Sequence, residues 1–350
     1  MASRLIPAAS SMATRILLLL PFLAVASLSS SSTIKPMIIT PAAAQSEEPT
    51  TATSRTEEVK VRRLTDGTML WTPSSSEKHN DDDDGPYPTM VWGVGAATTC
   101  VMYAPLFRDL AKKGVATACP TSANPQHLVK TVRFLSAEGI SFPIALGGHS
   151  YGGNTAQVAA SMLGEGEVVG IGNFPGGLCP LGVFGCNAHG VRVPFMAVSP
   201  SSDVNQIGVK ENVFNFIQAP KIWVSMSAWV GHSDVMKGAV RGSIGELALL
   251  WFRWLLLQDT SSAEILWRSG QLNQYPNVID VDIEFDNARR LLSEEEEEEE
   301  ENNLAAFATN TTTTAATNST SVVVMRRTMK LAAKAFLEQP RTQQRLSAAG

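Results

Sequence analysis

The hydrophobic pattern along the chain alternates between two periods. Short apolar runs, typical of buried strands, are followed by longer segments in which apolar residues recur every three or four positions, as in amphipathic helices. Strands that alternate with helices at this spacing form parallel sheets, so the sequence predicts an α/β fold with a mostly parallel central sheet and helices on both faces. The expected strands are 56–64, 67–73, 89–95, 115–120, 142–148, 168–174, 191–199 and 220–227, and the expected helices are 103–114, 125–139, 154–164 and 244–259.

Both end regions of the chain lack this alternation. Residues 1–45 contain two arginines, no acidic residue and an apolar stretch, Ile16–Leu28, that is too short to cross a bilayer. This arrangement predicts a signal peptide and a secreted protein without a transmembrane segment in its mature form, and the serine-rich composition leaves a plastid presequence as the alternative. Residues 291–350 combine an acidic run with a Thr/Asn-rich tract that is too polar to build a core, and end in a segment that could form a helix. The predicted globular domain is therefore 56–290.

The net charge of -5 comes from two acidic runs. Without the glutamates of Glu294–Glu301 the charge is +3, and without Asp81–Asp84 as well it is +7. The lysines and arginines of this mildly basic remainder are scattered along the sequence, whereas a nucleic-acid surface needs them gathered on one face. The sequence therefore does not predict a nucleic-acid partner.

Four cysteines stand in the predicted domain. An even number in a presumed secreted protein favours disulfides, and the lack of any C-x-x-C pair argues against a zinc site. The short glycine-rich segment between Cys179 and Cys186 makes this pair the expected disulfide. A bond between Cys100 and Cys119 is the second option, and buried free thiols are the third.

A G-x-S-x-G motif follows the apolar strand at 142–148 and precedes the expected helix at 154–164. In this context Ser150 would stand on a sharp turn at the carboxyl end of a strand, where ligands bind in α/β sheets. The motif by itself is weak, because serines in ordinary glycine-rich loops also match it. A serine hydroxyl also needs a histidine base, and that base needs a carboxylate to orient it.

The order of residues after Ser150 selects its partners. In this fold class the carboxylate follows the serine and the histidine comes last. Asp203 stands just past the end of an expected strand, and His232 lies in the loop beyond the next one. The other acids between Ser150 and His232 do not stand at strand ends, and His232 is the only histidine that follows Asp203; the acids set aside are Glu165, Glu167 and Glu211, and the other histidines are His79, His127, His149 and His189.

The domain resembles the α/β-hydrolases of the cutinase and polyester hydrolase branch, which has dienelactone-hydrolase-like and chlorophyllase-like relatives. The resemblance covers about 200 residues and is carried by GTMLWTP, GVGAATTCVMYAPLFRDLAKKGV, GGHSYGG, VPFMAVSPSSDVN, GHSDV and LALLWFRWLLLQDTSSAEILW. It implies a monomeric serine hydrolase of small or polymeric carboxylic esters that uses no metal and no cofactor. Ser150 would be the nucleophile, His232 the base and Asp203 the residue that orients it.

The same resemblance implies an oxyanion hole made of two backbone amides, those of Ala96 and Tyr151. The chain departs from the family at this point, because the family usually carries an aromatic side chain at Ala96 and often a methionine at Tyr151. A tryptophan that cutinases carry near NFPGG is also missing. Two alternatives to a secreted esterase stay open: a chlorophyllase-like plastid hydrolase and a binding module of the same fold without useful turnover.

Overall fold

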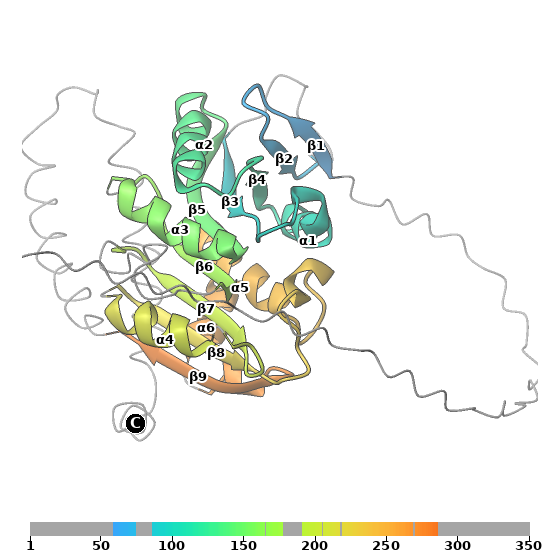
Figure 1. The fold of residues 1–350 in the computed structure, drawn as a ribbon. Helices are drawn as coiled ribbons and strands as arrows, with labels where there is room; N and C mark the ends of the chain where they lie inside the picture. The colour runs from blue at the N-terminus through green and yellow to red at the C-terminus, as the bar shows by residue number, and fades with distance from the viewer. Residues whose placement is uncertain are drawn as a thin grey trace, which may run out of the picture. The chain divides into compact units, whose positions relative to one another are not determined.

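The computed structural model describes residues 59–74, 86–164, 166–177, 191–204, 206–217, 219–268 and 270–285. The expected presequence (1–45) and tail (291–350) lie outside them. The described residues form a nine-stranded sheet with the order β1-β2-β4-β3-β5-β6-β7-β8-β9 (Figure 1). The strands are β1 Lys60–Arg63, β2 Met69–Thr72, β3 Tyr87–Gly93, β4 Ala116–Cys119, β5 Ser141–Ser150, β6 Ile171–Gly176, β7 Phe195–Pro200, β8 Lys221–Met226 and β9 Val278–Glu284.

The centre of the sheet is parallel and its edges are antiparallel. Neighbouring strands from β4 through β3, β5, β6 and β7 to β8 pair in parallel, whereas β1, β2 and β9 join by antiparallel pairs. The carboxyl ends of β3, β5, β7 and β8 therefore meet at one edge of the sheet. The expectation of an α/β fold with a mostly parallel sheet is confirmed.

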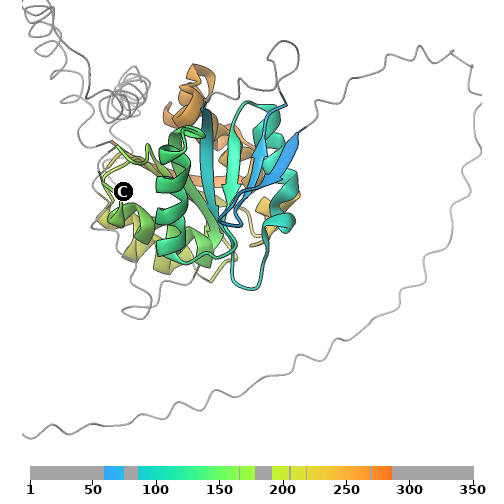
Figure 2. The ribbon, with the colours of Figure 1, turned by 90° about the horizontal axis from the view of Figure 1, so that it is seen from above.

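Two hydrophobic cores show that helices cover both faces. Along β5, Ala145 belongs to one core while its neighbours Ile144 and Leu146 belong to the other, as expected for alternating side chains. One core takes residues from α1, α5 and α6 and the other from α2, α3 and α4, which lie on opposite sides of the sheet (Figure 2). The helices are α1 Ala104–Lys112, α2 Pro125–Ala137, α3 Tyr151–Met162, α4 Gln206–Asn212, α5 Ile244–Leu257 and α6 Thr260–Trp267.

Two elements, α6 and β9, were not among those expected from the sequence, whereas α4 agrees with the helix-like stretch around Glu211. Strand β9 has the sequence VIDVDIE and pairs antiparallel with β8 along Lys221 to Met226. Its alternation of apolar and acidic residues is a strand signal, since an edge strand needs only one buried face. The acidic side has a partner as well, because Lys221, which is 4% exposed, forms an ion pair with Glu284 at 2.8 Å.

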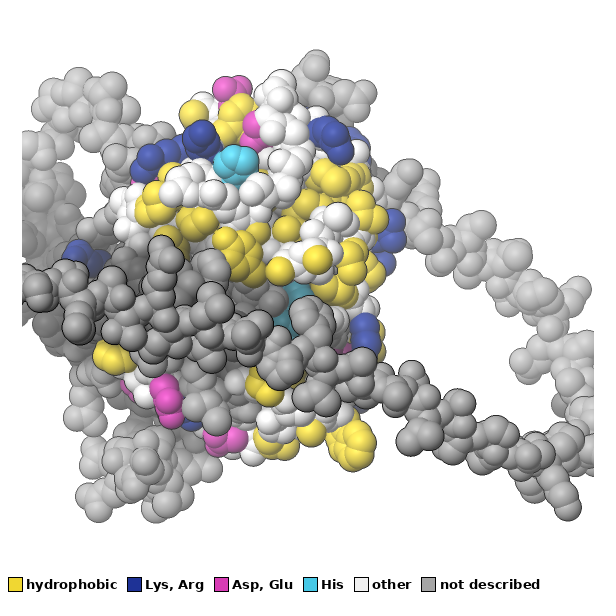
Figure 3. Space-filling model, in the orientation of Figure 1, with side chains coloured by type: hydrophobic (Ala, Val, Ile, Leu, Met, Phe, Trp, Pro, Cys, Tyr) yellow, Lys and Arg dark blue, Asp and Glu magenta, His cyan; other side chains and the backbone are white. Residues whose placement is uncertain are grey.

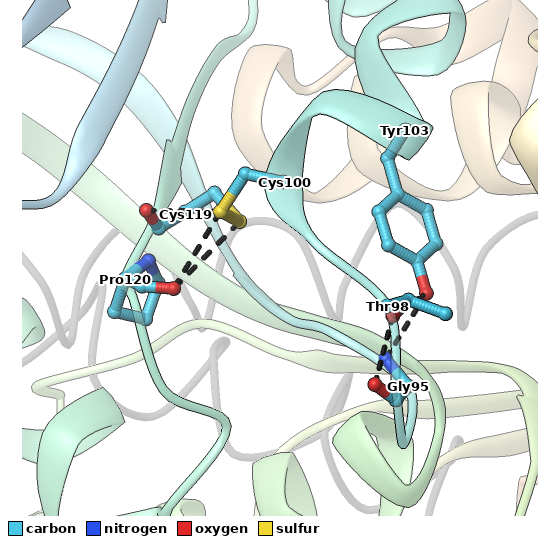
Figure 4. The surroundings of a disulfide bond; sticks show 6 residues. All are labelled: Gly95, Thr98, Cys100, Tyr103, Cys119 and Pro120. Atoms are coloured by element: carbon cyan, nitrogen blue, oxygen red, sulfur yellow. Dashed lines mark hydrogen bonds between the residues drawn. A yellow bond between two sulfur atoms is a disulfide. The ribbon is translucent and has the colours of Figure 1, made fainter.

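A disulfide joins Cys100 and Cys119 (Figure 4). It connects the short 3-10 helix η1, Cys100–Tyr103, which precedes α1, to the last residue of β4. The sequence ranked this pair second, because nothing local shows that η1 folds back onto the end of β4. The first-ranked pair, Cys179–Cys186, lies outside the described residues.

We expect removal of this disulfide to destabilise the protein. It closes a loop with a sequence separation of 19, which constrains the unfolded chain by about 3 kcal/mol in the loop-entropy estimate. A Cys100→Ala/Cys119→Ala variant should therefore lose about that much free energy of unfolding in urea denaturation. Reduced wild-type protein is the control and should approach the variant. A loss below about 1 kcal/mol would show that the loop is already restrained in the unfolded state.

Candidate active site

Ser150 stands on a strained turn between β5 and α3. Its backbone angles are φ 55° and ψ -124°, a conformation that is uncommon for a residue with a side chain. Two glycines permit this turn: a Cβ atom at Gly148 would meet the backbone of Gly152, and one at Gly152 would meet the carbonyl of Gly93. The first turn of α3 therefore packs directly on the sheet. This packing holds Ser150 at the carboxyl end of β5, half-exposed.

Asp203 and His232 are brought together by neighbouring strands. Asp203 follows β7 and His232 follows β8, and these strands pair in parallel. Nδ1 of His232 lies 2.5 Å from Oδ2 of Asp203, whose side chain is 5% exposed against 33% for the imidazole. The carboxylate accepts from Nδ1, so that the neutral form of His232 has a free acceptor at Nε2. This is the protonation pattern that a general base needs.

His149 connects the serine turn to the loop of His232. Its Nε2 atom donates to the backbone carbonyl of His232 at 3.0 Å, and the two imidazole centroids are 4.8 Å apart. The residue next to Ser150 in the chain therefore contacts the expected base. The Ser150 hydroxyl itself makes no hydrogen bond to another described residue, and the bond between nucleophile and base is often long before a substrate arrives.

The loop after β3 presents backbone amides beside this site. The amide of Gly95 donates to the Tyr103 hydroxyl at 3.0 Å, while the Thr98 amide and hydroxyl donate to the Gly95 carbonyl (Figure 4). Both backbone groups of Gly95 are thus hydrogen-bonded, whereas the amide of Ala96 has no acceptor within the described part of the chain. The second expected donor, Tyr151, is the first residue of α3, where amides lack intrahelical acceptors. Ala96 and Tyr151 stay predictions for the oxyanion hole.

The other candidate carboxylates have different roles. Glu167 pairs with Arg133 at 2.9 Å, and this hydrogen bond lowers the pKa of Glu167. Glu211 is exposed on α4. Asp234 accepts from the amide of Ile244 at the start of α5, a capping role. Glu165, like His79 and His189, lies outside the described residues, and the remaining alternative base, His127, is exposed on α2.

Sequence patterns indicated no role for Tyr103 and His149, which the structure places in contact with each other and, through His149, with the loop of His232. The Tyr103 hydroxyl lies 2.7 Å from Nδ1 of His149. Burial, aided by repulsion from a charged His232, lowers the pKa of His149 to about 4. The position of His149 beside Ser150 was a signal in the sequence. No sequence pattern indicated Tyr103, which is separated from His149 by 46 positions.

Acid should destabilise the protein through His149. The unfolded chain takes up a proton at this residue near pH 6.5, but the folded chain does so only near pH 4. The stability that the neutral side chain contributes is complete above about pH 6.5 and is lost as the pH falls toward 4, at about 1.4 kcal/mol per unit. In urea denaturation, wild type should lose about 2 kcal/mol more than His149→Gln between pH 7 and roughly pH 4.5. Equal losses in both proteins would show that His149 is not held neutral.

Apolar side chains are exposed on the loops of Asp203 and His232, at the start of α3 and on η1. Trp229, three residues before His232, is 93% exposed, and Val204, next to Asp203, is 85% exposed. Tyr151 and Met102 are 39% and 46% exposed. On the face seen in Figure 3, hydrophobic side chains gather in the upper middle and at the right, and lysine and arginine side chains lie nearer the rim. Exposed apolar side chains therefore stand close in sequence to Ser150, Asp203 and His232.

The described residues lack two further features. No set of three or more His, Cys, Asp and Glu side chains is arranged to hold a metal ion. No helix within the described ranges has the length and apolar character needed to cross a membrane.

Comparison of the chain with protein-family models and with curated proteins finds no match.

Proposed function

We propose that this protein is a serine hydrolase of the α/β-hydrolase fold that cleaves carboxylic esters through an acyl-enzyme intermediate. The observation that carries the proposal is the 2.5 Å pair of Asp203 and His232, located at the same edge of the sheet as the strained turn of Ser150. The order of the three residues along the chain supports it, as does the serine turn between a strand and a helix.

Each residue has a defined step in the proposed reaction. The Ser150 oxygen attacks the ester carbonyl carbon while Nε2 of His232 takes the hydroxyl proton, and Asp203 stabilises the resulting imidazolium. The carbonyl oxygen becomes an oxyanion that accepts from the amides of Ala96 and Tyr151. Collapse of this intermediate breaks the C–O bond, and the imidazolium gives its proton to the leaving alcohol. Water then repeats the sequence on the acyl-serine, releasing the acid and restoring Ser150.

The apolar rim of the site supports an ester whose acyl or alcohol part is hydrophobic. Exposed Trp229 and Val204 border the loops of His232 and Asp203 and would gain by covering an apolar group. Ala96, which stands where the resembled family has an aromatic ring, is itself exposed and leaves more space beside Ser150. We therefore propose aliphatic esters as the first substrates to test.

We further propose that the protein is secreted. The Cys100–Cys119 disulfide is typical of an oxidising compartment, and it agrees with the apolar stretch Ile16–Leu28 near the N-terminus. Expression of the full chain with a C-terminal tag should deliver the protein to the medium. Accumulation of the tagged protein in plastids would favour the chlorophyllase-like alternative instead.

A panel of p-nitrophenyl esters of increasing acyl length tests the activity. We expect turnover of short and medium chains with an initial burst of p-nitrophenol, because acylation precedes hydrolysis of the acyl-enzyme. Preincubation with a fluorophosphonate should abolish the turnover. A protein that reacts with the fluorophosphonate but hydrolyses none of the esters would be a serine hydrolase of another substrate class. No reaction with either would favour a binding module.

A further inference from the structure

We propose that His149 is a positioning residue that holds two loops in fixed relation to Ser150: the loop of the base, His232, and the loop after β3 that carries Gly95 and Ala96, here called the oxyanion loop. This inference rests on the proposed function and adds to it two residues, His149 and Tyr103, that do not touch the substrate. It comes from a chain of three hydrogen bonds that starts at the amide of Gly95, passes through both side chains and ends at the carbonyl of His232.

The direction of every bond in this chain follows from its ends. The carbonyl of His232 can only accept, so Nε2 of His149 must carry the proton. The neutral imidazole then has its lone pair at Nδ1, and the Tyr103 hydroxyl donates to it at 2.7 Å. The Tyr103 oxygen in turn accepts from the amide of Gly95 at 3.0 Å. All polar atoms used in the chain are satisfied in one tautomer only.

Burial keeps these three hydrogen bonds in the one tautomer described above. His149 is 3% exposed and Tyr103 is fully buried, so water has little access to either polar group. The titratable groups that face His149 are His232, Asp203 and Tyr103. The pKa of His149 is lowered to about 4, so it stays neutral while His232 gains and loses a proton. A second cation 4.8 Å from the imidazolium of His232 is thereby avoided.

The oxyanion loop packs directly on His149. A Cβ atom added at Gly95 would lie 2.8 Å from Nδ1 of His149 and 3.2 Å from the Tyr103 oxygen. The loop therefore follows the position of the imidazole closely. Tyr103 accepts from the amide of Gly95 and so holds the residue directly before Ala96, whose own amide has no acceptor within the described part of the chain. These hydrogen bonds thus couple the two groups that must act together in the transition state, the proton acceptor His232 and the proposed oxyanion donor Ala96.

Three substitutions separate the hydrogen bonds on the Tyr103 side of His149 from its bond to the carbonyl of His232. Tyr103→Phe removes the hydroxyl and keeps the ring. His149→Asn keeps an acceptor near the place of Nδ1 and loses the donor to His232. His149→Gln keeps a donor near the place of Nε2 and loses the acceptor for Tyr103. The matched controls are Tyr275→Phe, at a half-buried tyrosine that follows the 3-10 helix Leu272–Gln274, and His127→Gln, at an exposed histidine.

The experiment measures kcat and KM on a p-nitrophenyl ester, normalised to the sites that a fluorophosphonate titrates, so that misfolded protein is not counted. We expect Tyr103→Phe and His149→Gln to lower kcat roughly 10- to 100-fold with KM within about threefold, because an oxyanion contact acts in the transition state. His149→Asn should lower kcat and also change the pH profile of kcat/KM, because the base loop loses its anchor. The controls should match wild type.

The outcomes separate the two proposals. If wild type neither reacts with the fluorophosphonate nor hydrolyses the ester, the proposed function fails. If wild type does both while the Tyr103 and His149 variants stay within threefold of it, only the positioning role is overturned. A loss confined to the number of titrated sites, with kcat per site unchanged, would also overturn it, since that is the result of a structural role alone.

Discussion

Ester hydrolysis by Ser150→Ala should be at least about 10⁴-fold slower than by wild type, because serine hydrolases that lose a triad residue lose at least that much turnover. The fold should be kept. Alanine has the same Cβ as serine, so the strain of the turn at φ 55° does not increase. The Ser150 side chain also makes no hydrogen bond to another described residue that the substitution would break.

The control is Ser161→Ala on α3. The Ser161 hydroxyl donates to the carbonyl of Val158, as many helix serines do, and lies outside the proposed site. The measurement is kcat/KM on a p-nitrophenyl ester for all three proteins, with circular dichroism as the test of folding. Turnover by Ser150→Ala within tenfold of wild type would remove Ser150 as the nucleophile.

Asp203→Asn should lower kcat/KM by about 10³- to 10⁴-fold near neutral pH. The carboxylate accepts from Nδ1 of His232 at 2.5 Å in a place where water has little access. An asparagine amide can donate to Nδ1 instead, which moves the imidazole proton to Nε2 and leaves no acceptor for the Ser150 proton. It also removes the negative charge that stabilises the imidazolium.

Glu211→Gln is the matched control for this substitution, because it makes the same change from carboxylate to amide at an exposed position of α4. Asp234 is unsuitable as a control, since its carboxylate accepts from the amide of Ile244 and pairs with Lys237 at 2.8 Å. Steady-state kinetics on one ester compares the proteins. Similar losses in the Asp203 and Glu211 variants would contradict the assignment of Asp203.

The sequence predicted those parts of the molecule that local patterns determine. The apolar runs of the parallel strands were clear because both faces of such strands are buried, and the strand before Ser150 was expected at 142–148 against the observed Ser141–Ser150. The pairing of Asp203 with His232 was also predicted, since both follow strands and the order of triad residues is fixed in the fold class.

Contacts between distant segments were beyond such patterns. The hydrogen bonds of His149 join residues separated by 46 and 83 positions, and they depend on how the loops after β3 and β8 pack. The Cys100–Cys119 disulfide depends in the same way on η1 approaching β4. Short spacing made another cysteine pair look preferable, although a short spacing says nothing of the directions in which the two side chains point.

Fluorophosphonate labelling followed by peptide mapping is the direct test of Ser150 as the nucleophile, because it identifies the reacting residue without knowledge of the natural substrate. The proposed mechanism requires a single adduct on Ser150 in wild type, its absence in Ser150→Ala and its slow formation in Asp203→Asn. An unlabelled wild-type protein that folds normally, or an adduct on a residue other than Ser150, would contradict it.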